Sequence, residues 1–207
     1  FGLAAAAPPN ELHWRNALTP AAVLLALSLL IQALNYGVMG GWLAFYVSRK
    51  LGATVPVCLA LLCVFWLALT SGRVAASRLP RALSRVGALA GVSIASILGC
   101  LFLLNTGETS GAFVGAMLAG GGLGALHPLT MAAGSRRGGQ RPAAFVPGFF
   151  VTTFLGGILL AGLVGPLAAR YGVDVVVWVS LAGAIAAMLV ATVIAIESKL
   201  SEAAAAR

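Results

Sequence analysis

The sequence predicts an all-α membrane protein with six transmembrane helices. Three observations lead to this fold class: long stretches without charge, a strongly apolar composition, and short connections between the stretches. Six stretches of 22 to 33 residues contain no Asp, Glu, Lys or Arg, and each exceeds the roughly 20 residues that a helix needs to cross a bilayer. These stretches are Asn16–Ser48, Leu51–Gly72, Val86–Gly107, Thr109–Ser135, Pro142–Ala169 and Val175–Ile196.

The composition excludes a soluble fold. Hydrophobic residues make up 60% of the chain and charged residues 9%, and the mean hydropathy is +1.02. Soluble domains carry about 25% charged residues, so this chain has too little polar surface to solvate one. Lipid excludes open sheet edges, and the stretches lack the alternating pattern of a membrane barrel, so the spans should be helices.

The chain divides into three parts. We expect a linker or cytoplasmic N-terminal segment at 1–18, a transmembrane domain at 19–197 and a cytoplasmic tail at 198–207. Short loops make consecutive spans antiparallel neighbours. The spans are expected at about 19–47, 53–72, 86–104, 111–134, 143–169 and 175–196.

The 13 Lys and Arg residues orient the spans. When the loops are assigned to alternate sides, ten of these residues fall on the side of both termini, the 73–85 loop and the 136–141 loop. Cytoplasmic loops collect Lys and Arg, so both termini are predicted to be cytoplasmic. The net charge of +8 therefore reflects the orientation of the spans in the membrane. No nucleic-acid partner is predicted, because no basic surface with interleaved aromatic residues is present.

The polar side chains of the 19–47 span share one face. Gln32, Asn35, Tyr36 and Met39 follow the i, i+3, i+4, i+7 spacing of a helix. A buried amide without a partner costs several kcal/mol in hydrocarbon, so this face should meet a watery cavity or another polar group. We favour a cavity lining that contacts a hydroxylated solute, and interhelical hydrogen bonding is the alternative.

Aromatic and hydroxyl side chains elsewhere suggest further solute contacts. Trp66 lies in the 53–72 span, and Thr152 lies in the 143–169 span. Together they would offer a sugar-like solute a stacking surface and a hydrogen-bonding group. The alternative is that aromatic residues of these spans face lipid or pack between helices.

The 86–104 and 175–196 spans are predicted to support the bundle from outside. Small residues recur at every fourth position in both, which lets helix backbones approach closely in lipid. These residues are Gly91, Ala95 and Gly99 in the first span and Gly183, Ala187, Ala191 and Ala195 in the second.

Glycine clusters interrupt the 19–47 and 111–134 spans. Clustered Gly and internal Pro weaken a helix, and interrupted spans at corresponding positions of two inverted triplets point to a transporter's binding site. We therefore predict a 3+3 inverted repeat with helix breaks or gating in these spans, while ordinary close packing is the alternative. The residues concerned are Gly37, Gly40, Gly41, Gly120, Gly124 and Pro128.

His127 stands between the second glycine cluster and Pro128. We expect it to line the cavity, with a structural hydrogen bond or a proton relay as alternatives. All five acids fall outside the spans or at their ends, so no carboxylate pair is available for hydrolysis inside the membrane. The sequence also lacks HExxH and GxSxG motifs, so no enzyme activity, metal or other cofactor is predicted.

Four segments resemble helices of major facilitator superfamily transporters, and the fucose/sugar permease-like branch looks nearest. Gln32–Tyr46 is similar to the seventh helix of the family, and Phe65–Arg78 is similar to the eighth helix and the start of its basic loop. Gly120–Pro128 resembles the tenth helix and Gly156–Gly172 the eleventh. The 73–85 loop departs from the family motif because it lacks an acid.

The resemblance covers about Thr19 to Ile196 and implies the C-terminal six-helix half of a twelve-helix transporter. Such a half moves a small polar solute, here of a sugar-like class, by alternating access, and the coupling acids of sugar symporters belong to the other half. Its partners would be the solute, the lipid bilayer and a second six-helix half. Two other classes stay open: a six-helix half-transporter acting as a homodimer, and a non-transporting membrane subunit or scaffold. The candidate solute contacts are Gln32, Asn35, Tyr36, Trp66, His127 and Thr152.

Overall fold

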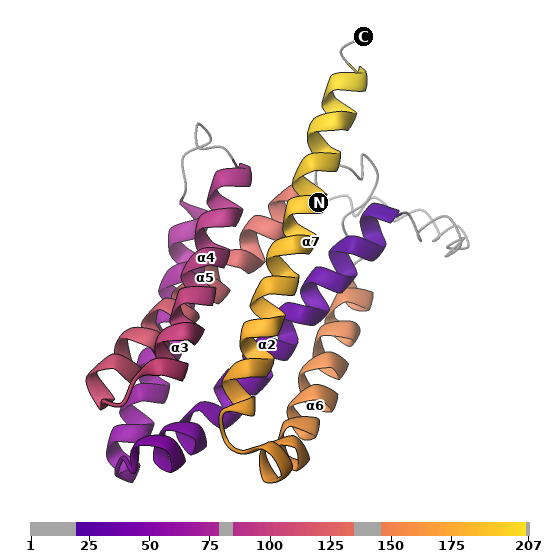
Figure 1. Ribbon diagram of the computed structural model, residues 1–207. Helices are drawn as coiled ribbons and strands as arrows, with labels where there is room; N and C mark the ends of the chain where they lie inside the picture. Colours follow the sequence, from indigo (N-terminus) through magenta and orange to yellow (C-terminus); the bar gives the residue numbers. More distant parts are fainter. Residues whose placement is uncertain (1–19, 79–84, 135–145, 206–207) are drawn as a thin grey trace, which may run out of the picture.

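The chain folds into a bundle of helices (Figure 1). The computed structural model describes residues 20–78, 85–134 and 146–205, and in these residues it contains six helices and no strand. The predicted all-α fold with six helices is confirmed. The helices are α2 (Pro20–Leu51), α3 (Val55–Ser77), α4 (Arg85–Asn105), α5 (Thr109–Gly134), α6 (Val146–Tyr171) and α7 (Val175–Ala205).

Most of these helices have the length and composition of membrane spans. Five described segments are apolar enough and long enough to cross a bilayer, and the apolar part of α6 that the structure describes, Leu155–Tyr171, is shorter. Many large apolar side chains on the bundle surface are exposed, as expected for a surface in contact with lipid. The chain is therefore an integral, multi-pass membrane protein. The five segments are Ala26–Leu51, Val55–Ser77, Gly87–Asn105, Thr109–Thr130 and Val175–Val193.

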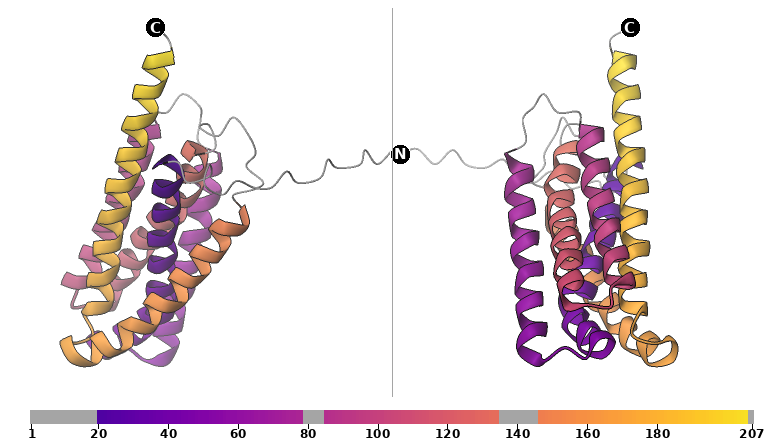
Figure 2. Two further views of the ribbon diagram at one scale, coloured as in Figure 1. Left: turned by 90° about the vertical axis from the view of Figure 1, so that its right-hand side faces the viewer. Right: turned by 60° about the vertical axis from the view of Figure 1, so that its left-hand side comes forward.

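Two helices extend past the expected spans. α3 continues to Ser77, so Arg73 lies inside this helix and not in a 73–85 loop. α7 continues to Ala205 through most of the expected tail, and Figure 2 shows it running beyond the ends of the other helices. The expected segment 1–18 and the basic 136–141 loop lie outside the described residues.

Three tight turns join helices at one end of the bundle, which we call the short-turn end. They connect α2 to α3, α4 to α5 and α6 to α7. Gly52 and Gly172 lie in two of these turns with φ of 62° and 91°, a backbone region in which a Cβ is strained. Pro56 lies in the first turn of α3, where its missing N–H leaves no helical hydrogen bond unmade.

Side chains of α2 close the short-turn end by capping α4. The last carbonyls of a helix lack helical partners. The Tyr46 hydroxyl donates to the Leu103 carbonyl at 2.6 Å, and Lys50 Nζ donates to the Leu104 carbonyl at 2.6 Å. Lys50 also pairs with Asp174 Oδ1 at 2.8 Å, which ties the α6–α7 turn to the same cluster. This cluster, which we call the Lys50 clamp, joins α2, α4 and the start of α7.

The most extensive helix contacts are preserved when α2, α3 and α4 are exchanged with α5, α6 and α7, respectively. α3 packs on α5, and its counterpart α6 packs on α2. α4 packs on α5, and its counterpart α7 packs on α2. The pairs α2–α5 and α4–α7 map onto themselves, whereas the smaller contacts α2–α3, α6–α7 and α5–α7 have no counterpart of similar extent among the described residues. This pattern is the one that a 3+3 inverted repeat produces, and it places α2 and α5 at the centre of the bundle.

Small residues allow the closest helix contacts. A Cβ on Gly99 of α4 would meet the backbone of Gly115 and Ala119 of α5, and a Cβ on Gly183 of α7 would meet the side chain of Asn35. The small-residue face expected around Gly91 is only partly used, because Gly91 is exposed and has nothing within 4 Å of its Cβ position.

Candidate functional site

The polar face predicted on α2 points into the bundle. Gln32 is fully buried, and its Nε2 donates to Ser28 Oγ at 3.0 Å and to Thr130 Oγ1 of α5 at 3.3 Å. Thr130 in turn donates to the Leu126 carbonyl at 2.8 Å. Gln32 Oε1 is buried and has no hydrogen-bond partner among the described residues. The amide of Gln32 therefore bridges α2 to α5 and does not reach the bundle surface.

Asn35 is also fully buried, and it faces α7. With its amide oriented to satisfy both groups, Asn35 donates to the Ser180 carbonyl at 3.1 Å and accepts from the Ala184 N–H at 3.3 Å. Gly183 leaves the space that this side chain occupies. In this structure, interhelical hydrogen bonding accounts for both Gln32 and Asn35, and neither lines an open surface.

Tyr36 lies at the edge of the same face and reaches a different environment. Its hydroxyl donates to the Leu123 carbonyl in the middle of α5 at 2.8 Å. The guanidinium carbon of Arg73, on α3, lies 5.2 Å from the centroid of the Tyr36 ring. This distance is within the range of a cation–π contact. Tyr36 therefore holds the Arg73 head group near the middle of the bundle.

Trp66 lies on α3, where its indole covers Gly40 of α2. The Trp66 side chain is 43% exposed, and a Cβ on Gly40 would lie 2.6 Å from its Cζ2 atom. Gly41, the next residue, has nothing within 4 Å of its Cβ position and is exposed. Gly40 therefore provides the space in which the Trp66 ring sits.

The residues of α3 sort into three faces. One face is buried. A second face is exposed and mostly apolar, which suits contact with lipid: Leu67 and Val74 lie where it borders the third face, and Ala75 lies on its far side. The third face is exposed but polar and aromatic, with residues that recur at three- and four-residue spacing. We call this third face the α3 stripe, and it consists of Cys63, Trp66, Thr70, Arg73 and Ser77.

His127 and Thr152 are the remaining predicted solute contacts. His127 is partly buried on α5, one residue before Pro128, and lies within electrostatic range of Arg73. Thr152 falls in α6, but its side chain lies outside the part of the chain that the structure describes. The structure thus places Tyr36 and His127 near Arg73 of the α3 stripe, while Trp66, two turns earlier on the same stripe, lies against Gly40.

The helices are not broken at the predicted glycine clusters. α2 and α5 are each continuous, and Pro128 lies inside α5. A Cβ on Gly37 would lie 2.8 Å from the Gly157 carbonyl of α6. Gly120 and Gly124 likewise contact the backbone of α3 at Phe65 and Leu69. Close packing, the alternative to a break, describes these three glycines in this structure.

Sequence reasoning missed Arg73 and treated it as a loop charge. The signal that identifies it is the spacing of Trp66, Thr70 and Arg73, which places a cation on the same helix face as an aromatic and a hydroxyl. The predicted span ends at Gly72, because the first basic residue after a long apolar run indicates the start of a loop. This prediction places Arg73 outside the helix that carries Trp66 and Thr70.

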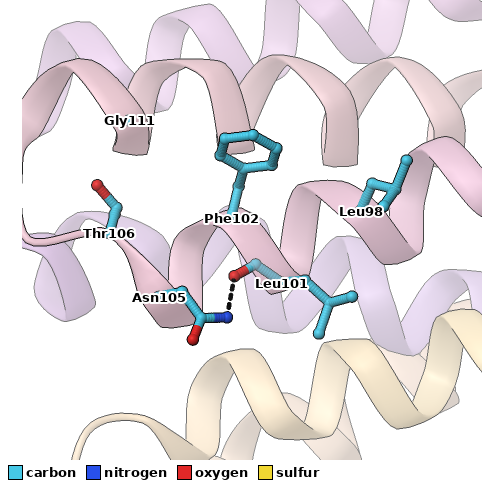
Figure 3. A pocket seen from close by; sticks show the side chains of 6 residues that line it. All are labelled: Leu98, Leu101, Phe102, Asn105, Thr106 and Gly111. Carbon is cyan, nitrogen blue, oxygen red and sulfur yellow. Dashed lines mark hydrogen bonds between the residues drawn. The ribbon is translucent and has the colours of Figure 1, made fainter.

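A shallow pocket of about 380 Å³ lies elsewhere, between α4 and α5 at the short-turn end (Figure 3). Its polar groups are satisfied locally: the Asn105 amide donates to the Leu101 carbonyl at 2.8 Å, and the Thr106 hydroxyl donates to the Glu108 carbonyl at 2.9 Å. The rest of the lining is apolar or glycine, so this pocket is a lipid-side groove and not a polar site. It is lined by Leu98, Leu101, Phe102, Asn105, Thr106 and Gly111.

The fold is similar to that of a transporter. The crystal structure of the peptide transporter POT in complex with sulfate aligns with this chain at a TM-score of 0.68 and 20% sequence identity. The alignment covers 84% of this chain and 37% of that chain. No protein-family model matches the sequence, and no curated protein matches it. The chain therefore shares its fold with part of that transporter, and the likeness gives no support for a sugar permease branch.

Proposed function

We propose that this chain is one six-helix half of a secondary transporter that moves a small polar solute across a membrane by alternating access. The solute would bind against the α3 stripe and the adjacent Tyr36 and His127. The main supporting observation is the position of Arg73, a charged side chain that lies over Tyr36 inside a membrane span. Ionisable residues within spans are costly in lipid and usually belong to a polar pathway.

The likeness of fold supports the same proposal. The transporter that this chain resembles is longer, and the chain spans 37% of its length. A site on the exposed α3 stripe is incomplete in the six described helices, because solutes in such folds bind between two bundles that rock against each other. The second bundle would come from the same polypeptide or from a second copy of this chain.

The class of solute is proposed as polar, and the sugar-like class comes only from the sequence resemblance. The amides that suggested a hydroxylated solute belong to Gln32 and Asn35, which are hydrogen-bonded within the bundle. Of the polar residues on that face of α2, Tyr36 is the one whose side chain contacts the α3 stripe, through Arg73. Both termini are proposed to be cytoplasmic because of the excess of Lys and Arg on that side.

Aqueous accessibility along α3 tests the proposal. Single cysteines at successive positions of α3, in full-length protein lacking its native cysteines, would be exposed to a membrane-impermeant thiol reagent in intact membranes. We expect reactivity to peak on the α3 stripe, for example at T70C, and to be absent at exposed positions on the far side of the helix, for example at A75C. Uniformly unreactive positions would indicate a dry scaffold and would refute the transporter half.

A further inference from the structure

We propose that the solute carries an anionic group, a carboxylate or a phosphate, and that Arg73 binds this group. This inference rests on the proposed transport function and names the chemistry of the same site. It follows from the depth of Arg73, from the placement of the described carboxylates, and from the donors that its contact with Tyr36 leaves available.

Arg73 lies further from the end of its helix than the other cations whose side chains the structure describes. Arg49, Lys50 and Arg170 lie in the last turn of their helices, and Arg78 is the C-cap of α3. Long basic side chains at such positions extend toward the membrane surface. Arg73 lies more than one turn before the end of α3, and its head group rests on a tyrosine near the middle of the 32-residue α2. The Arg73 head group therefore lies against α2 and does not extend past the end of α3.

No described carboxylate neutralises Arg73. Asp174 pairs with Lys50, and Glu108 accepts from the Ser110 hydroxyl at 3.2 Å. Both acids lie at the short-turn end, whereas Arg73 lies near the opposite end of α3. Glu197 and Glu202 belong to α7, but their side chains lie outside the part of the chain that the structure describes. His127, the nearest described titratable side chain of α5, adds no negative charge. Within the described residues, the α3 stripe is thus a positively charged surface.

The contact with Tyr36 leaves the guanidinium able to bind an anion. A guanidinium carries five N–H donors, more than a single tyrosine side chain can engage. These donors match the paired oxygens of a carboxylate or phosphate, which Arg binds through two parallel hydrogen bonds. Trp66, seven residues before Arg73 on the same stripe, offers an apolar surface for the rest of the solute.

The decisive experiment is protection of T70C from a thiol reagent, in full-length protein with Cys63 replaced by Ser. Three anions are compared with neutral molecules of similar size: acetate with acetamide, glucuronate with glucose, and glycerol 3-phosphate with glycerol. We expect at least one anion to protect T70C at concentrations at which its neutral match does not. Arg73→Gln should weaken this protection roughly ten- to a hundredfold, because it removes a charged hydrogen-bond partner.

Two matched variants control for folding. Arg78→Gln removes a cation from the end of the same helix and should leave protection unchanged. Arg73→Lys keeps the charge without the planar fork and should retain part of the protection. Equal protection by anions and neutral molecules, or an anion preference that survives in Arg73→Gln, would overturn the proposal.

A lipid headgroup phosphate carries the same anionic oxygens as a soluble anion, so a separate set of protection measurements distinguishes the two. The assay is repeated in lipid-poor detergent, in phosphatidylcholine nanodiscs and in nanodiscs containing phosphatidylglycerol. Protection by lipid alone, with none from the soluble anions, would assign Arg73 to a headgroup and would overturn the proposal. A T70C thiol that never reacts would instead remove the proposed transport function, so the two failures are distinguishable.

Discussion

Gly40 and Gly41 are neighbours in the sequence but differ in their surroundings. Gly40 lies against the indole of Trp66, whereas the Cβ position of Gly41 is open. The sequence places both residues in one glycine cluster that is predicted to interrupt the helix. Their separate roles could not be predicted, because the helix rotation that turns one toward α3 and the other away depends on how α2 packs against its neighbours.

Gly40→Ala should displace the Trp66 ring. A Cβ at this position would lie 2.6 Å from the ring, and because the ring is 43% exposed it has room to swing aside. We expect a change in the emission of a variant whose single tryptophan is Trp66, with a loss of less than ~1 kcal/mol in the free energy of unfolding. Gly41→Ala should change neither quantity. An equal emission change in both variants would contradict the assignment of Gly40 as the space beneath Trp66.

The polar face of α2 was predicted from the sequence, but its direction was not. Spacing alone placed Gln32, Asn35 and Tyr36 together. Whether that face meets water or other helices depends on partners such as Thr130 and Ser180, which lie roughly 100 or more residues away in the sequence. Long-range partners of this kind leave no local pattern, so the alternative of interhelical hydrogen bonding stayed open until the helices were placed.

The contact between α3 and α5 depends on glycine. Cβ atoms on Gly120 and Gly124 of α5 would meet the backbone carbonyls of Phe65 and Leu69, and a Cβ on Gly72 of α3 would meet Gly121. Helices in lipid associate through such close packing, because lipid tails solvate apolar side chains as well as another helix does. The glycines that suggested a helix break from sequence therefore set the distance between two intact helices.

Gly124→Ala should separate α3 from α5. The added methyl group would contact backbone atoms that cannot rotate away, so we expect the free energy of unfolding to fall by about 1–3 kcal/mol. Unfolding in detergent mixtures with increasing SDS measures this loss. Gly91→Ala, on the exposed surface of α4, is the matched control and should cause none. Equal losses in the two variants would contradict the packing role of Gly124, because Ala favours a helix more than Gly does and propensity alone causes no loss.

The Lys50 clamp should stabilise the short-turn end. Lys50→Met removes both the ion pair with Asp174 and the hydrogen bond to Leu104, and we expect a loss of about 1–2 kcal/mol. Asp174→Asn should cost less, about 0.5 kcal/mol, because that carboxylate is half exposed and water screens the pair. The same unfolding assay compares them with Arg49→Met, whose exposed cation lies over Phe45. A loss in Arg49→Met as large as in Lys50→Met would contradict the clamp.

The number and type of helices could be predicted because bilayer thickness imposes a length that charge-free stretches reveal directly. Helix ends were less predictable. α3 continues past Gly72 and includes Arg73, because the Arg73 guanidinium lies over the Tyr36 ring and its charge does not end the span. Composition marks where lipid contact is favourable, but it does not mark where a polar face inside the bundle permits a charge.

The six helices together form a bundle with one polar face left exposed. The exchange symmetry of the packing places α2 and α5 at the centre, and the α3 stripe lies beside them. Under the proposed function this exposed face would meet a second bundle, with the solute enclosed between the two. The central claim is that the α3 stripe meets water from each side of the membrane in turn.

Modification of T70C from both sides of the membrane tests that claim most directly. The full-length protein, with Cys63 replaced by Ser, would be placed in right-side-out and in inverted vesicles and treated with a membrane-impermeant thiol reagent. The account predicts that T70C reacts in both preparations, while A75C, at an exposed position about 140° around the same helix, reacts in neither. A T70C thiol that stays unreactive from one side or from both would contradict alternating access at this face.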